Sequence, residues 1–132
     1  MLTLCVFPGE YAVCQLSPAA TLPKWAITGE LFSVTRTPDE LSVVCAASQV
    51  PAEVKHTAGW AALKLHGPFD FALSGILAGV LRPLHRAEVG IFALSTYDTD
   101  YVLVQAAQLE LAVSALREAG YTVQDSTVQD SA

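Results

Sequence analysis

The residues best suited to binding a small ion lie within residues 67–84, where a strand end, a polar turn and a helix start follow one another. The first N–H groups of a helix have no intrahelical acceptor and carry the positive end of its dipole, so Ser74-Gly75-Ile76 is suited to a carboxylate. Asp70 precedes this segment and offers a partner for a cation. The alternative is structural, because an acid before a helix often caps it or ends a turn.

Composition limits the classes of protein that this chain can represent. Its 132 residues are enough for one ordinary domain or two very small ones. Hydrophobic residues make up 52% and charged residues 15%, which predicts a buried subunit interface and therefore a homodimer. Seven basic and thirteen acidic residues give a net charge of −6, which disfavours nucleic acid as a partner. Without a basic leader or an apolar run of roughly 18 residues, we expect no membrane partner and a cytoplasmic location.

Metal and cofactor chemistry finds little support in the sequence. The cysteines form no C-x-x-C pair and are expected to be reduced, buried small hydrophobes: Cys5, Cys14 and Cys45. The histidines lack the spacing of metal ligands: His56, His66 and His85. We therefore expect neither a metal nor a cofactor.

A catalytic constellation is also missing from the sequence. Ser74 lies outside a G-x-S-x-G elbow, and no phosphate loop or dinucleotide motif occurs. Asp98 and Asp100 form a weak acid–base candidate, since aspartates in a turn more often bond their own backbone. The sequence thus predicts a protein that is not an enzyme, with a small hydrolase or transferase using Ser74 or Asp98 as an alternative.

The first half of the chain reads as two hairpins. Strand-like residues 2–7 and 11–16 flank Pro8-Gly9-Glu10, and strand-like residues 31–36 and 40–46 flank Thr37-Pro38-Asp39. A short helical turn is expected between the hairpins, within residues 18–26. Residues 1–56 are therefore predicted to form a small unit of hairpins.

The second half alternates between strand and helix periodicity. Strands are predicted at residues 60–66, 89–95, 101–105 and 121–123, and amphipathic helices at 74–87 and 109–119. This βαββαβ order is typical of an α+β, ferredoxin-like unit in which two helices cover one face of an antiparallel sheet. We assign it to residues 57–123. The tail, residues 124–132, has little apolar content and is expected to be disordered.

The order of these landmarks resembles that of the ACT domains, small ligand-binding modules that regulate amino-acid metabolism. Gly75 at the first helix and Gly90 before the next strand match the glycines of that pattern. More narrowly, the chain is similar to small tandem-ACT proteins related to the regulatory ends of aspartate kinases and to cytosolic arginine sensors. That similarity is carried by separated motifs in order: Phe32-Ser-Val-Thr-Arg-Thr-Pro-Asp-Glu-Leu, Gly67-Pro-Phe-Asp-Phe, Ser74-Gly-Ile and Ser95-Thr-Tyr-Asp-Thr-Asp-Tyr. By this resemblance, residues 1–56 are a reduced ACT-like unit.

The resemblance implies a regulatory protein that binds a free amino acid at the strand-to-helix junction or between ACT units, and that acts on an enzyme or another protein. The matching positions are Asp70, Phe71, Ser74, Gly75, Ile76, Leu77, Ser95 and Thr96. Asp98 joins the candidate site by its residue type, as a carboxylate that could contact an ammonium or a basic side chain. The alternative is a structural assembly module with no small-molecule ligand, in which these residues serve only as caps and turns.

Overall fold

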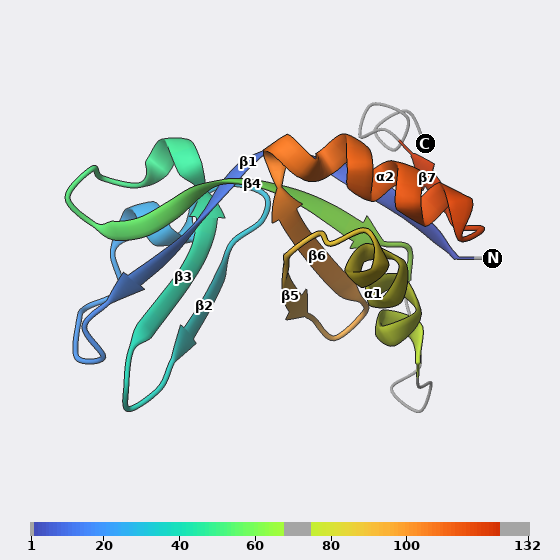
Figure 1. The fold of residues 1–132 in the computed structure, drawn as a ribbon. Coiled ribbons are helices and arrows are strands. Elements are labelled where there is room, and N and C mark those ends of the chain that lie inside the picture. Colours follow the sequence, from blue (N-terminus) through green and yellow to red (C-terminus); the bar gives the residue numbers. More distant parts are fainter. Residues whose placement is uncertain (1, 68–74, 125–132) are drawn as a thin grey trace. The chain divides into compact units, whose positions relative to one another are not determined.

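The computed structural model describes residues 2–67 and 75–124, which divide into two compact units. The hairpin unit comprises residues 9–60, and the helical unit comprises residues 1–8 together with residues 61–132. The division falls within strands β1 (Thr3–Leu16) and β4 (Lys55–Leu65), so each of these strands contributes to both units (Figure 1). Each unit has a hydrophobic core of its own.

The hairpin unit is built from short strands and two single helical turns. Strands β2 (Ser33–Arg36) and β3 (Leu41–Ala46) pair antiparallel, and β3 pairs antiparallel with residues 11–16 of β1. The 3-10 helices are η1 (Lys24–Ile27) and η2 (Ala47–Gln49). The core gathers small and branched side chains from η1, β1 and β3: Ala12, Cys14, Ala26, Leu41, Val43 and Cys45. The predicted second hairpin and the helical turn before it are confirmed.

The predicted first hairpin is wrong. Strand β1 runs without reversal through Pro8, Gly9 and Glu10, so residues 2–7 and 11–16 do not pair with each other. Instead, residues 3–5 pair with one strand of the helical unit, and residues 11–16 pair with β3. Gly9 adopts a positive φ of 99° inside the strand, a conformation that glycine tolerates without the steric cost of a side chain. Turn-forming residues therefore mark a local distortion and a change of partner, not a reversal of the chain.

The helical unit has the predicted βαββαβ order. After β4 come α1 (Ile76–Arg86), β5 (Ile91–Ser95), β6 (Asp100–Gln105), the 3-10 turn η3 (Ala106–Gln108), α2 (Leu109–Glu118) and β7 (Thr122–Gln124). The strand β4 starts at Lys55, earlier than the predicted residue 60. Of the tail predicted at residues 124–132, only Gln124 lies within the described residues.

The sheet of the helical unit contains one strand that the sequence pattern does not assign to it. The strand order is β1-β4-β6-β5, with β7 paired to β1. The first residues of β1 pair in parallel with β7, with Thr3 opposite Thr122 and Leu4 opposite Val123. On its other side β1 meets β4, where the N–H of His66 donates to the carbonyl oxygen of Thr3 at 2.8 Å. The βαββαβ unit is thus completed by the N-terminal segment of the chain.

Both helices pack on the same face of this sheet. Their inward residues, Val80, Leu84, Ala112 and Leu116, belong to one core cluster with strand residues such as Leu4 and Leu63. Residues of α1 and α2 also contact each other. Burial of this apolar face fixes the helices, and with them the start of α1 and the long exposed side of α2.

Candidate functional site

The turn between β5 and β6 is closed by its own threonines. The N–H of Thr96 donates to the carbonyl oxygen of Thr99 at 2.8 Å, and the N–H of Thr99 donates to Oγ1 of Thr96 at 3.2 Å. Oγ1 of Thr96 also donates to the carbonyl oxygen of Thr99. This reciprocal pattern is the way in which Thr side chains stabilise tight turns. The turn is therefore preorganised, without any need for a ligand to order it.

Thr99 also ties this turn to the end of β4. Its side chain is 7% exposed, and its Oγ1 donates to the carbonyl oxygen of Leu65 at 2.6 Å. Strand β4 ends at Leu65, and the chain then leads toward α1. A buried hydroxyl that lost this partner would carry an unsatisfied polar group at a cost of about 1–3 kcal/mol. Thr99 thus fixes the β5–β6 turn beside the end of the strand that precedes the junction.

The start of α1 offers backbone donors. The residue before the helix, Gly75, is left-handed with φ 81° and ψ −4°, and its carbonyl oxygen accepts the first helical bond from Gly79 at 2.9 Å. Within the described part of the chain, no acceptor meets the N–H groups of Ile76 and Leu77. The side chains of these two residues pack partly against the core. They would therefore contribute backbone N–H groups to a site, and their side chains serve the fold.

The predicted site residues fall into three groups. Gly75, Ile76 and Leu77 lie at the start of α1, whereas Ser95, Thr96 and Asp98 lie in or beside the β5–β6 turn. Asp70, Phe71 and Ser74 lie outside the described residues. The structure brings the β5–β6 turn to the end of β4, through the hydrogen bond between Thr99 and Leu65.

The polar side chains of the β5–β6 turn differ in the hydrogen bonds that they make. Ser95 donates from Oγ to Oδ1 of Asp100 at 2.5 Å, which uses the Asp100 carboxylate within the turn. Asp98 is exposed, and its carboxylate has no hydrogen-bond or ionic partner among residues 2–67 and 75–124. The same described ranges hold no group of three or more side chains suited to a metal ion. Asp98 is therefore the carboxylate in this turn that a cationic group can reach.

Substitution of Gly75 tests the backbone at the start of α1. Gly75→Ala is expected to lower the free energy of unfolding by about 1 kcal/mol, because a left-handed residue with a Cβ costs roughly that much. Nothing lies within 4 Å of a Cβ placed there, so the cost is conformational and not a clash. Equilibrium urea unfolding measures it. Gly90→Ala is the matched control, since that site is equally open and its φ is not positive. Equal losses in both variants would contradict the account.

The three cysteines are buried, and their thiols are poor nucleophiles. Cys14 and Cys45 are buried and free, and the strand register places Cys14 opposite Val43 and Cys45 opposite Ala12. Burial, together with the neighbouring Cys45, raises the pKa of the Cys14 thiol to about 12. Burial likewise raises the pKa of Cys45 and Cys5. These groups stay protonated at neutral pH, which suits small hydrophobes and not catalytic thiolates. The prediction that all three cysteines are buried is confirmed.

Sequence reasoning missed Thr99, although its neighbours Thr96 and Asp98 are among the predicted site residues. Its partner, Leu65, lies 34 residues away in the sequence, so no local pattern could reveal the bond. The threonine spacing was the available signal, because Thr at both ends of a four-residue turn favours side-chain closure. Separately, among the described residues no helix is both long and apolar enough to cross a membrane.

Comparisons with known proteins agree with this architecture. The ACT domain family model matches residues 55–118, and a model of an N-terminal domain matches residues 9–53. The crystal structure of an Agrobacterium tumefaciens protein is 38% identical, with 94% of this chain and 92% of that chain covered and a TM-score of 0.89. The comparison with curated proteins gave no match.

Regulatory parts of aspartate kinases share the fold at low identity. The regulatory subunit of aspartate kinase from Thermus thermophilus is 13% identical over 89% of this chain and 96% of that chain, with a TM-score of 0.59. Aspartokinase III of E. coli, solved in complex with lysine and aspartate, is 13% identical over 89% of this chain and 32% of that chain, with a TM-score of 0.58. The matched family model and the βαββαβ order agree: residues 55–118 of this chain belong to the ACT domain family.

Proposed function

We propose that this chain is a cytoplasmic regulatory module that binds a free amino acid and performs no turnover of its own. The observation that carries the proposal is the start of α1, where backbone N–H groups without an acceptor among the described residues follow the left-handed Gly75. Membership of the ACT domain family supports a regulatory role, and lysine and aspartate are named as ligands of a protein with the same fold.

The chemistry of an α-amino acid fits these groups. Its carboxylate suits the N–H groups of Ile76 and Leu77 together with the positive end of the α1 dipole. Its ammonium suits the exposed carboxylate of Asp98. The proposed set also includes Ser95, Thr96 and, beyond the described residues, Asp70, Phe71 and Ser74.

The Thr99–Leu65 hydrogen bond gives this proposal a route for regulation. Thr99 joins the turn that carries Asp98 to the end of β4, so a ligand held by the turn would also act on that strand. A ligand shifts a conformational equilibrium only as far as it binds one state better than the other. We propose that the regulated partner, an enzyme or another protein, binds the two conformations with different affinity and so responds to the change in their populations.

A thermal-shift panel of the twenty amino acids tests the proposal. One amino acid should raise the Tm selectively, because a ligand at 100 times its Kd stabilises the native state by about 2.7 kcal/mol. Asp98→Asn should reduce this shift, whereas Asp39→Asn, at an exposed aspartate in the β2–β3 turn, should not. A selective amino acid whose shift survives Asp98→Asn unchanged would place the site elsewhere.

The second candidate is a homodimeric assembly module with no small-molecule ligand. It is favoured by the turn itself, since the hydroxyls of Ser95 and Thr96 already make hydrogen bonds within it. It is favoured also by exposed apolar side chains in one stretch of the hairpin unit: Leu22, Ile27, Phe32 and Val34, which are 36–43% exposed. A flat amino-acid panel, with the mass of a dimer by light scattering, would favour this candidate. A selective response from a monomer would exclude it.

A further inference from the structure

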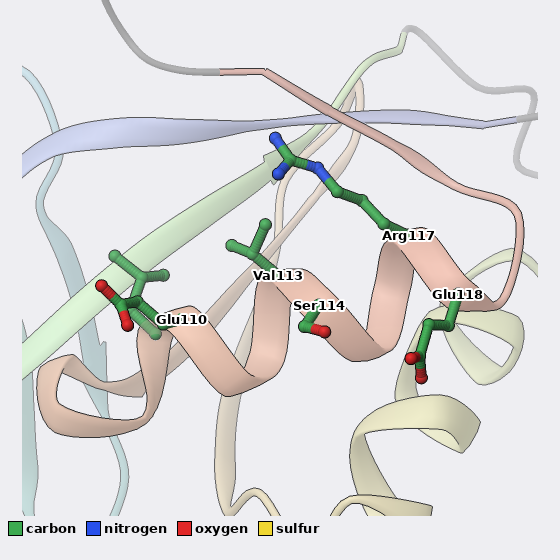
Figure 2. A pocket seen from close by; sticks show the side chains of 6 residues that line it. Glu110, Val113, Ser114, Arg117 and Glu118 are labelled. Carbon is green, nitrogen blue, oxygen red and sulfur yellow. The ribbon is translucent and has the colours of Figure 1, made fainter.

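Two adjoining hollows follow α2 on the surface of the helical unit. One, of about 440 Å³, is lined by Leu109, Glu110, Val113, Ser114, Arg117 and Glu118 (Figure 2). The other, of about 280 Å³, is lined by Val6, Leu109, Val113, Arg117, Val123 and Gln124. Both share Leu109, Val113 and Arg117, which are four residues apart and so form one stripe of the helix. We call the two hollows together the α2 groove.

The floor of the smaller hollow is apolar. Leu109, Val113 and Val6 are partly buried against the core, and Val123 is 5% exposed. The remaining lining is the Gln124 amide and the Arg117 guanidinium. A volume of about 280 Å³ lies near the lower end of the range for small-ligand pockets, which is roughly 300–1,000 Å³. The hollow therefore suits a short aliphatic chain.

Arg117 is held at the edge of β7. The N–H of Thr122 donates to the carbonyl oxygen of Leu2, so Thr122 faces β1 and the carbonyl of the next residue, Val123, faces away from β1. Nη2 of Arg117 donates to this Val123 oxygen at 2.8 Å. Figure 2 shows the Arg117 side chain reaching from α2 toward the strands, whereas Glu118 points the other way. The guanidinium is thus positioned at the mouth of the apolar hollow.

Among the residues that the structure describes, most N–H donors of this guanidinium meet no acceptor. Arginine carries five N–H donors, and within the described part of the chain the Val123 oxygen is the acceptor that Arg117 meets. A guanidinium with free N–H groups matches a carboxylate in charge and in planar geometry. Glu110 and Glu118 also line the groove, and their repulsion of a dianion such as phosphate would be twice that of a monoanion at the same position. The charges favour a monoanion.

We propose that the α2 groove binds a short aliphatic monocarboxylate, with its carboxylate on Arg117 and its chain on Val6, Val113 and Val123. This site does not depend on the proposed amino-acid site, which uses the start of α1 and the β5–β6 turn. Binding at the two sites would shift the amide signals of different residues, so one proposal can be disproved without the other.

Titration of the ¹⁵N-labelled full chain with hexanoate, hexylammonium and inorganic phosphate tests the proposal by amide chemical shifts. Hexanoate should give saturable shifts in α2 and β7, and the other two probes should not. Arg117→Gln should weaken hexanoate about tenfold, the effect of losing a charged hydrogen bond of about 1.4 kcal/mol. Arg82→Gln, an equal charge change at an exposed position of α1 outside the groove lining, should leave the affinity unaltered.

Arg117→Gln also removes the hydrogen bond to the carbonyl oxygen of Val123, and its amide spectrum would show whether the fold is lost with it. A second variant keeps the test decisive in that case. Val113→Glu leaves Arg117 in place and puts a carboxylate into the groove, so it should also abolish hexanoate binding. Equal hexanoate affinity in Arg117→Gln or Val113→Glu would overturn the proposal. Equal binding of hexylammonium, or shifts confined to residues 75–77 and 95–100, would overturn it too.

Discussion

A fragment of residues 57–124 is expected to remain unfolded in isolation, although it contains every element of the βαββαβ pattern. The reason is β1. Leu4 is fully buried in the core of the helical unit, and β7 pairs with β1 through Thr3–Thr122 and Leu4–Val123. Without residues 2–8, β7 loses its pairing partner and the core opens along one side. Far-UV circular dichroism and the dispersion of amide signals should show no cooperative structure.

The matched control restores the missing strand to the same fragment. A variant in which residues 2–8 follow Gln124 through a flexible Gly/Ser linker should regain a cooperative unfolding transition. A fragment of residues 57–124 that folds without the strand would contradict the role of β1. It would support the boundary that the sequence predicts, a domain of residues 57–123.

Leu84→Ala should produce a large loss of stability in the helical unit. Leu84 is fully buried where α1 packs on the sheet, in the same cluster as Val80 and Leu116. Removal of a buried leucine side chain costs about 2–5 kcal/mol, since the transfer free energy and the cavity both count. Equilibrium unfolding in urea measures the loss, and the amide spectrum shows whether the fold persists.

Leu111→Ala is the control for this prediction. Leu111 has the same chemistry and lies on the other helix, but 48% of its side chain is exposed. Its substitution should change the free energy of unfolding by about 0.5 kcal/mol or less. If both leucine variants lost similar stability, the assignment of the core to this helix face would be wrong.

Much of the secondary structure could be predicted because local patterns carry it. The periodicity of Ile76, Val80 and Leu84 predicted α1, and Leu109, Val113 and Leu116 predicted α2. Alternation and turn residues predicted the β2–β3 hairpin. The same reasoning failed at Pro8-Gly9-Glu10, because turn propensity says where a chain departs from regular geometry but not which strand lies beside it.

The candidate site was accessible to sequence reasoning only in part. Gly75 and the β5–β6 turn carry recognisable residue types, and six of the predicted positions lie within the described residues. The threonine spacing indicates closure of the turn, but it does not indicate the bond from Thr99 to the carbonyl oxygen of Leu65. Arg117 carries no local signal, since its acceptor is the carbonyl oxygen of Val123 on another element. In the sequence, Arg117 cannot be told from any other exposed arginine, and Thr99 cannot be told from any other threonine in a turn.

Short-range periodicity and motif order are enough to predict the α+β class, the order of strands and helices from β2 onward and the resemblance to ACT domains. Three features came to light in the folded structure: β1 joins the helical unit beside β7, Thr99 ties the β5–β6 turn to β4, and Arg117 lies beside an apolar hollow. These features depend on contacts between distant residues, which form when apolar faces are buried together and which no local propensity encodes.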